Sequence, residues 1–248
     1  MQNFTKFGRR EMLAGGTLGL AATAASAALI NGESASTTQL SSDALPDTTP
    51  DLTGAPYLSH AEAGLVGAVF DRLIPQDDLS IGAVEAGCVD FLQRQLAGDW
   101  GHAATRYRAG PFRPGTPEQG DQSPLTPRER YRTGLKAMAL AVSKATAKAF
   151  GDLSADEQDD FLRAMEAGHH GDTLKSVFAL MLQNVREGYF ADPLYGGNKD
   201  MAGWALVGFP GARYDYRQEI DRPGADLGLA PVSLMGRTRV PGQAGGAA

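Results

Sequence analysis

The sequence predicts an all-α protein, with about five helices in an irregular bundle joined by long ordered loops. Three segments begin with a Ser or Thr followed three residues later by Glu, the pattern that caps a helix N-terminus: Ser59–Glu62, Thr126–Glu129 and Ser154–Glu157. Apolar residues then recur at spacings of three and four, as on one face of a helix. Strict alternation of apolar and polar residues is missing and β-branched residues are sparse, so no sheet is expected.

The same spacing places each helix along the chain. The first is expected over residues 59–75, where a proline ends it, and the second from about residue 82 or 84 to residue 96. Cys88 falls in the apolar stripe of the second helix, which indicates a small core residue rather than a reactive thiol. Three longer helices and a short helical turn are then expected, at residues 126–150, 154–168, 172–185 and 201–206.

Two segments interrupt or follow this helical pattern. Residues 98–125 contain nine glycines and prolines, a density that argues against any regular element. Three aromatic residues lie among these glycines and prolines: Trp100, Tyr107 and Phe112. They favour a packed loop or a contact with a partner. Residues 217–248 carry several prolines and end in a glycine-rich stretch, so they are expected to form an extended tail after a helical domain at residues 58–216.

The N-terminus resembles a twin-arginine export signal. Arg9 and Arg10 precede an uncharged run rich in Ala, Gly, Leu and Thr, and Ala25-Ser26-Ala27 has the small-x-small form of a cleavage site. Residues 1–27 are therefore expected to direct the folded chain through the twin-arginine translocase to the periplasm, either cleaved or kept as an anchor. Residues 28–57, rich in Ser, Thr, Asp and Pro, are expected to form a flexible linker.

Charge and cysteine content exclude several classes of partner and cofactor. The formal charge is −6, and the first 27 residues carry a net positive charge, so the remaining chain is more acidic still. Such a balance argues against nucleic acid as a partner. A single cysteine allows no internal disulfide and no thiolate cluster, and the C-x-x-C-H motif for haem attachment is absent from the sequence.

The sequence offers one weak catalytic motif. Glu166 and His169 match half of a carboxylate-bridged di-iron site, which requires a second such pair and two further glutamates on facing helices. An independent helical metalloenzyme that uses Glu166 and His169 is therefore one hypothesis, against a polar helix end that stops at Gly168. No G-x-S-x-G elbow, P-loop or G-x-G-x-x-G after a strand is present in the sequence.

Residues 184–211 differ from the rest of the chain, because they contain five aromatic residues and six glycines. Glycine permits close backbone approach and aromatic side chains supply contact area, so this composition is typical of a shaped loop pressed against a surface. That surface is either the protein's own core or another protein. A free-standing periplasmic binding protein is a further hypothesis from the same observation.

This segment, N-x-R-E-G-Y-F-A-D-P-x-Y-G-G-N-x-D-x-x-G-W-x-x-x-G-F-P-G, resembles the gluconate 2-dehydrogenase subunit 3 family, and we call it the signature segment. Asp71-Arg72-Leu73-Ile74-Pro75 and Gly82-Ala83-x-Glu85-Ala86-Gly87 support the resemblance. The resemblance implies a small, non-catalytic subunit without a cofactor of its own. It also implies an FAD-containing large subunit of the glucose–methanol–choline type and a multihaem cytochrome c subunit as partners. The small subunit is expected to escort the flavoprotein through export.

The candidate residues in the signature segment divide by side-chain type. Turn residues with short polar side chains or no side chain are expected to fix the loop: Asp192, Gly196, Gly197, Asn198 and Asp200. Aromatic residues are expected to anchor a desolvated contact: Tyr189, Phe190, Tyr195, Trp204 and Phe209. Arg186 and Glu187 are expected at a helix end, where the arginine favours the negative pole or clamps a carboxylate. Each of these residues serves either the internal scaffold or a partner interface.

Overall fold

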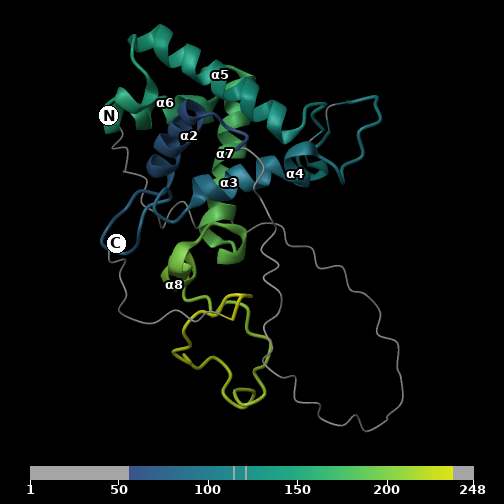
Figure 1. Ribbon diagram of the computed structural model, residues 1–248, viewed down its shortest axis with the longest axis vertical. Helices are drawn as coiled ribbons and strands as arrows, with labels where there is room; N and C mark the ends of the chain where they lie inside the picture. Colours follow the sequence, from purple (N-terminus) through teal and green to yellow (C-terminus); the bar gives the residue numbers. More distant parts are fainter. Residues whose placement is uncertain (1–55, 114, 121, 237–248) are drawn as a thin grey trace. The chain divides into compact units, whose positions relative to one another are not determined.

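The computed structural model describes residues 56–113, 115–120 and 122–236 and contains seven α-helices in these ranges (Figure 1). They are α2 (His60–Leu73), α3 (Cys88–Ala97), α4 (Asp99–His102), α5 (Pro127–Thr146), α6 (Ala155–Ala167), α7 (Asp172–Phe190) and α8 (Ala202–Val207). Within the described ranges there is no strand, only an isolated bridge between Gly211 and Val232. The all-α prediction is confirmed, although the chain has more helices than the five expected.

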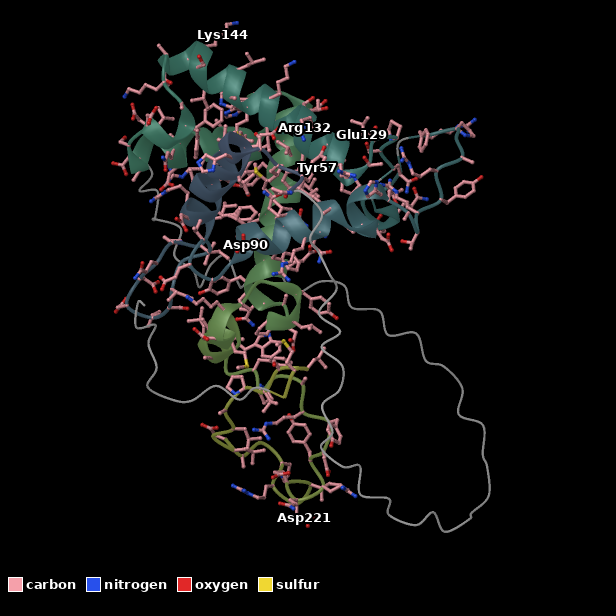
Figure 2. The ribbon with its side chains drawn as sticks, viewed as in Figure 1. Tyr57, Asp90, Glu129, Arg132, Lys144 and Asp221 are labelled. Carbon is pink, nitrogen blue, oxygen red and sulfur yellow. The ribbon has the colours of Figure 1, made fainter. Side chains whose placement is uncertain are left out.

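The predicted export signal lies outside the described residues, as does nearly all of the predicted linker. None of the helices in the described ranges combines the length and apolar character needed to cross a membrane. The described chain is anchored from its first residues. The Tyr57 hydroxyl donates to the Arg128 carbonyl at 2.8 Å, and the Arg132 guanidinium lies 4.7 Å from the centre of the Tyr57 ring (Figure 2).

Helix α7 is the central element of the fold. It contacts α2, α3, α5, α6 and α8, and Figure 1 shows it running through the middle of the helical body. A continuous apolar side explains this position, because the following α7 residues are all buried: Leu174, Val177, Phe178, Leu180, Met181, Val185 and Tyr189. A helix with so wide an apolar face packs against several other elements, while its polar face remains exposed.

All three predicted N-terminal caps are present. In each, the Glu side chain accepts a hydrogen bond from the backbone N–H of the capping residue, at 2.9 Å for Ser59, 2.7 Å for Thr126 and 2.7 Å for Ser154. These reciprocal bonds satisfy N–H groups that a helix start leaves without partners, and they stabilise the first turn of each helix. The N–H donors also lower the pKa of Glu129 and Glu157.

Helix boundaries differ from the prediction at three places. α3 begins at Cys88, later than predicted, because residues 83–87 form turns that end at Gly87 with a φ of 81°. α5 ends at Thr146 rather than residue 150, because Ala147 adopts the left-handed conformation. α7 continues beyond residue 185 to Phe190, which places the start of the signature segment inside a helix.

The prediction that residues 98–125 hold no regular element is wrong. They contain α4 and the short 3-10 helix Pro117–Gln119. Glycine enables the first of these, since a Cβ on Gly101 would lie 2.1 Å from the Leu96 carbonyl oxygen, closer than any side chain allows. Tyr107 and Phe112 are exposed, so of the two predicted alternatives these aromatics do not form a packed loop, and a contact with a partner stays a prediction.

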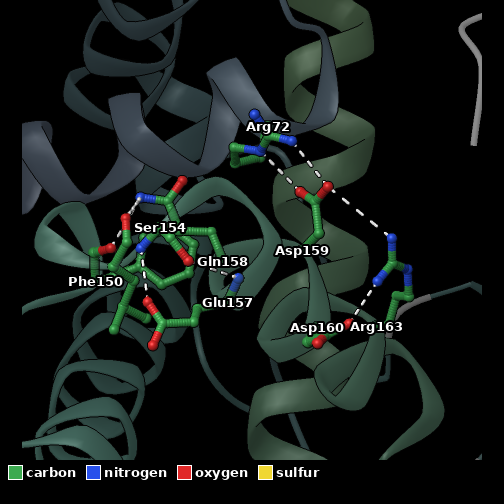
Figure 3. A network of polar contacts seen from close by, with 9 residues as sticks. Arg72, Phe150, Ser154, Glu157, Gln158, Asp159, Asp160 and Arg163 are labelled. Atoms are coloured by element: carbon green, nitrogen blue, oxygen red, sulfur yellow. Dashed lines mark hydrogen bonds and ion pairs between the residues drawn. The ribbon is translucent and has the colours of Figure 1, made fainter. Parts of the chain in front are cut away.

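Polar contacts connect α2 with α6, and α6 with the turn before it (Figure 3). The Arg72 guanidinium donates two hydrogen bonds to the Asp159 carboxylate, at 2.7 and 2.8 Å. Gln158, one residue earlier, is buried and donates to the carbonyls of Phe150 and Leu153 at 3.0 and 3.2 Å. The bidentate pair fixes the angle between the helices more than it adds stability, because its partners are partly solvated.

Cys88 is predicted to be unreactive in the folded protein. It is fully buried, and burial raises the pKa of its thiol to about 12, with a smaller contribution from the charge of Asp71. Because the thiolate is the reactive form, iodoacetamide at about pH 8 should leave the folded protein unlabelled and label it in denaturant, as read by mass spectrometry. Labelling of the native protein at the denatured rate would contradict this assignment.

Gly134 is predicted to be required for the contact between α5 and α7. A Cβ at Gly134 would lie 2.5 Å from a Val177 methyl carbon, so Gly134→Ala should destabilise the fold by about 1–3 kcal/mol in urea titrations. Gly64→Ala is the matched control, because an added Cβ there meets nothing within 4 Å and alanine is the better helix former. It should stabilise the fold by about 0.5–1 kcal/mol. Equal effects of the two changes would refute the packing argument.

Candidate functional site

The signature segment leaves the C-terminal end of α7 and folds back over it in short elements. After α7 ends at Phe190 come the 3-10 helices Pro193–Tyr195 and Lys199–Met201, followed by α8. Asp192 starts the first of these as an N-cap before a proline, and Gly196 ends it in the left-handed conformation. Asp192 and Gly196, which the sequence predicts to be turn residues, therefore set where this 3-10 helix begins and ends.

Asn198 is the polar centre of the signature segment. It is completely buried, and its side-chain amide donates to the Ala191 carbonyl at 2.8 Å while its oxygen accepts from the Gly203 N–H at 2.8 Å. One side chain thus joins the residue after α7 to the first turn of α8. Its φ of 49° is left-handed, a conformation that asparagine tolerates better than most residues.

Asp192 holds two chain segments together through its two carboxylate oxygens. One accepts from the Leu194 N–H at 2.9 Å and the other from the Leu234 N–H at 2.7 Å. The first bond is local and was expected from the turn sequence. The second reaches 42 residues along the chain and was not expected. Asp192 is buried, so both bonds are shielded from water.

Glycines allow the signature segment to lie directly on α7. A Cβ on Gly197 would be 2.1 Å from the Gly188 carbonyl oxygen, and one on Gly203 would be 2.1 Å from the Tyr189 carbonyl oxygen. On its other side the segment reaches the turn before α3, where the Lys199 N–H donates to the Ala86 carbonyl at 3.0 Å. The family-like motif at residues 82–87 is therefore in direct contact with the signature segment.

The aromatic candidates divide into buried and exposed residues. Tyr189 is fully buried, and its hydroxyl donates to the Ile81 carbonyl at 2.7 Å. Trp204 is buried and its indole N–H donates to the Phe190 carbonyl at 2.7 Å. Phe190 is half-buried, with its ring centre 5.3 Å from that of Tyr189. These three residues fix the protein's own loop.

Tyr195 and Phe209 present apolar surface to solvent from the same segment. Both are about half exposed, and the Phe209 ring meets Trp204 edge-on with 5.3 Å between ring centres. Asp200 is also exposed and adopts a left-handed backbone with φ of 54°. An exposed aromatic edge supported by buried aromatics is the arrangement expected of a contact surface.

The remaining two candidates, Arg186 and Glu187, lie near the C-terminal end of α7, which ends at Phe190. Glu187 is exposed, and its carboxylate accepts from Gln183 at 2.7 Å and from Asn184 at 2.8 Å. Asn184 in turn accepts a 2.8 Å hydrogen bond from the Tyr131 hydroxyl on α5, and burial raises the pKa of Tyr131 well above its usual value. Arg186 is half-buried in α7, which continues four residues beyond it to Phe190.

Glu166 and His169 are not joined by further candidate metal ligands. Glu166 is exposed near the end of α6, and His169 follows Gly168, whose left-handed conformation ends the helix as the sequence indicated. Across the described ranges, no group of three or more His, Cys, Asp or Glu side chains is arranged to hold a metal ion. Within those ranges, the set of four glutamates and two histidines that a di-iron site requires is not formed.

These features define a helical protein in which a buried loop scaffold, rather than a cluster of reactive side chains, is the distinctive site. Residues 60–211 match the family described as gluconate 2-dehydrogenase subunit 3, from α2 to the last glycine of the signature segment. The chain belongs to this family, whose members are subunits of a dehydrogenase complex. No curated protein and no solved structure matches the chain.

Sequence reasoning missed the partners that lie far along the chain. Asp192 accepts a hydrogen bond from the backbone N–H of Leu234, and Tyr189 donates one to the backbone carbonyl of Ile81. Because only backbone atoms of Leu234 and Ile81 take part, their side-chain types do not indicate these contacts in the sequence. The pairing of Gly211 with Val232 is of the same kind. Such contacts depend on where the backbone runs, which periodicity and motif spacing do not specify.

Asn198 is predicted to be the most sensitive polar residue of the scaffold. Asn198→Ala would leave the Ala191 carbonyl and the Gly203 N–H without their partners, which should destabilise the fold by about 2 kcal/mol or more in urea titrations. Lys199→Ala is the matched control, because Lys199 is exposed and bonds Ala86 through its backbone. It should change stability by less than about 0.5 kcal/mol. Similar losses from both would show that Asn198 has no special role.

Proposed function

We propose that this chain is the non-catalytic small subunit of a periplasmic FAD-dependent dehydrogenase complex that oxidises a sugar, sugar acid or polyol. Its task is the maturation, twin-arginine export and stability of the flavoprotein subunit. Membership of the subunit 3 family over residues 60–211 is the observation that carries the proposal.

The chemistry of the signature segment supports this role. Two of its buried polar side chains, Asp192 and Asn198, bind the chain's own backbone, and the Trp204 indole does the same. A catalytic group would instead direct a titratable or nucleophilic atom toward a substrate cavity. A segment whose polar atoms are bound internally and whose aromatic edge is exposed suits the binding of another protein.

The proposed complex assigns its cofactors to other subunits. FAD lies in a large subunit of the glucose–methanol–choline type, and haem c lies in a cytochrome subunit that passes electrons to the membrane. This chain holds no cofactor in the proposal and associates with the membrane through the complex. The acidic composition supports protein partners over nucleic acid.

The two other hypotheses have distinct consequences. A metalloenzyme built on Glu166 and His169 requires stoichiometric iron or manganese in the purified chain. A free-standing binding protein requires a chain that remains stable and monodisperse without a partner and does not alter the activity of a co-expressed flavoprotein.

The export role is tested by changing the arginine pair. The double variant Arg9→Lys, Arg10→Lys is co-expressed with an FAD-dependent large subunit from the same genome that has no signal peptide of its own. Because the translocase recognises the arginine pair, periplasmic dehydrogenase activity should fall to near background while the flavoprotein accumulates in the cytoplasm. Activity is measured in fractionated cells with an artificial electron acceptor.

Lys6→Arg is the matched control, because it changes a basic residue of the same N-terminal region and keeps its charge. It should leave periplasmic activity unchanged. Unaltered activity in the double variant would contradict the escort role.

A further inference from the structure

We propose that residues 212–231 form an arm that docks onto the FAD-containing large subunit, an inference that rests on the function proposed above. The arm begins directly after Gly211, where the family match ends, and it returns to the signature segment at Val232. It is therefore a feature of this chain beyond the matched residues, attached to the matched scaffold.

The base of the arm is fixed by backbone hydrogen bonds. The Ala212 N–H donates to the Val232 carbonyl at 2.7 Å, and the Val232 N–H donates to the Pro210 carbonyl at 3.2 Å. Just beyond this pair, the Leu234 N–H donates to the Asp192 carboxylate. The two ends of the arm are thus tied to each other and to the scaffold, so the arm has a defined exit direction although its own residues contain no helix or strand.

The arm carries large apolar side chains that the described part of the chain leaves exposed. Tyr214 is 98% exposed and Ile220 is 76% exposed, and Tyr216 is also exposed. The arm curls around an open hollow of about 660 Å³, whose lining residues all lie between positions 214 and 227. Asp221 lies at the tip (Figure 2). Among the described residues only those of the arm line the hollow, so the helical body does not cover these side chains.

Arg213 adds an unsatisfied donor at the base. Its guanidinium donates to the Ala230 carbonyl at 3.0 Å, but its Nε atom is buried and has no hydrogen-bond partner in the described part of the chain. A buried N–H without a partner is unfavourable, so the base of the arm contains one polar group that the described residues do not satisfy.

The composition of the arm favours a protein surface as the occupant. It contains three arginines, four acidic residues and two tyrosines in 20 residues. Arg and Tyr are the residues most enriched at the energetic centres of protein interfaces, whereas an arm for anionic lipid would need an excess of Lys and Arg. Since the family assignment makes this chain a subunit of a dehydrogenase complex, the large subunit is the partner to which we assign the arm.

The proposal is tested with the full chain, co-expressed with the large subunit and purified through a tag on that subunit. The double variant Tyr214→Ala, Ile220→Ala should bind the large subunit about tenfold more weakly or worse, because it removes the two most exposed apolar side chains of the arm. The matched control is Leu140→Ala, on the surface of α5, where the side chain is 63% exposed. It should bind as the wild type does.

The outcomes separate the arm from the proposed function. If the wild-type chain does not bind the large subunit, the proposed function fails and the arm proposal fails with it. If the wild type binds and the Tyr214→Ala, Ile220→Ala variant binds within twofold of it, the arm proposal alone is overturned. Unchanged thermal melting of the purified variant excludes misfolding as the cause of lost binding.

A second measurement avoids removing any contact. A photoreactive benzophenone amino acid at position 214 should cross-link to the large subunit on illumination, and the same group at position 140 should not. Cross-linking of position 214 to a second copy of this chain, or to nothing, would overturn the proposal.

Discussion

The part of the signature segment that follows α7 lies very close to the C-terminal end of that helix. The rest of the structure depends on this close approach. Gly197 and Gly203 lie against the backbone at Gly188 and Tyr189, where any side chain would collide with a carbonyl oxygen. At this separation no side chain fits between the two backbones, so the loop's own polar groups are buried with them. Asn198 solves that problem by bonding a carbonyl on one side and an N–H on the other.

The same constraint explains why three distant stretches act as one unit. Asp71 accepts a hydrogen bond from the Val84 N–H at 3.1 Å, which holds the turn at residues 82–87 beside the end of α2. That turn then contacts the signature segment through Ala86 and Lys199. Central α7 contacts α2, α3 and α8 through its wide apolar face, so it supports these loops as well as the surrounding helices.

A rigid scaffold with an exposed edge has consequences for binding. Side chains such as Trp204 and Tyr189 are immobilised by burial and by hydrogen bonds before any partner arrives. Preorganisation of this kind lowers the conformational entropy lost on association, which is a principal cost of forming a complex. The bond from Asp192 to Leu234 extends the ordered region to the segment at which the arm returns.

The sequence by itself determined the all-α class, the three capped helix starts and the turn character of Asp192, Gly196 and Asn198, because these depend on residues within four positions of one another. It also singled out the signature segment, since its aromatic and glycine content is visible locally. Tertiary structure alone decided that Tyr189 and Trp204 face inward while Tyr195 and Phe209 remain exposed. It also decided that α4 forms within a segment rich in glycine and proline. The same holds for the hydrogen bond between Asp192 and the backbone of Leu234, near the point where the arm ends. These outcomes depend on backbone carbonyls and amides far apart in the chain, whose positions follow from how the helices pack around α7.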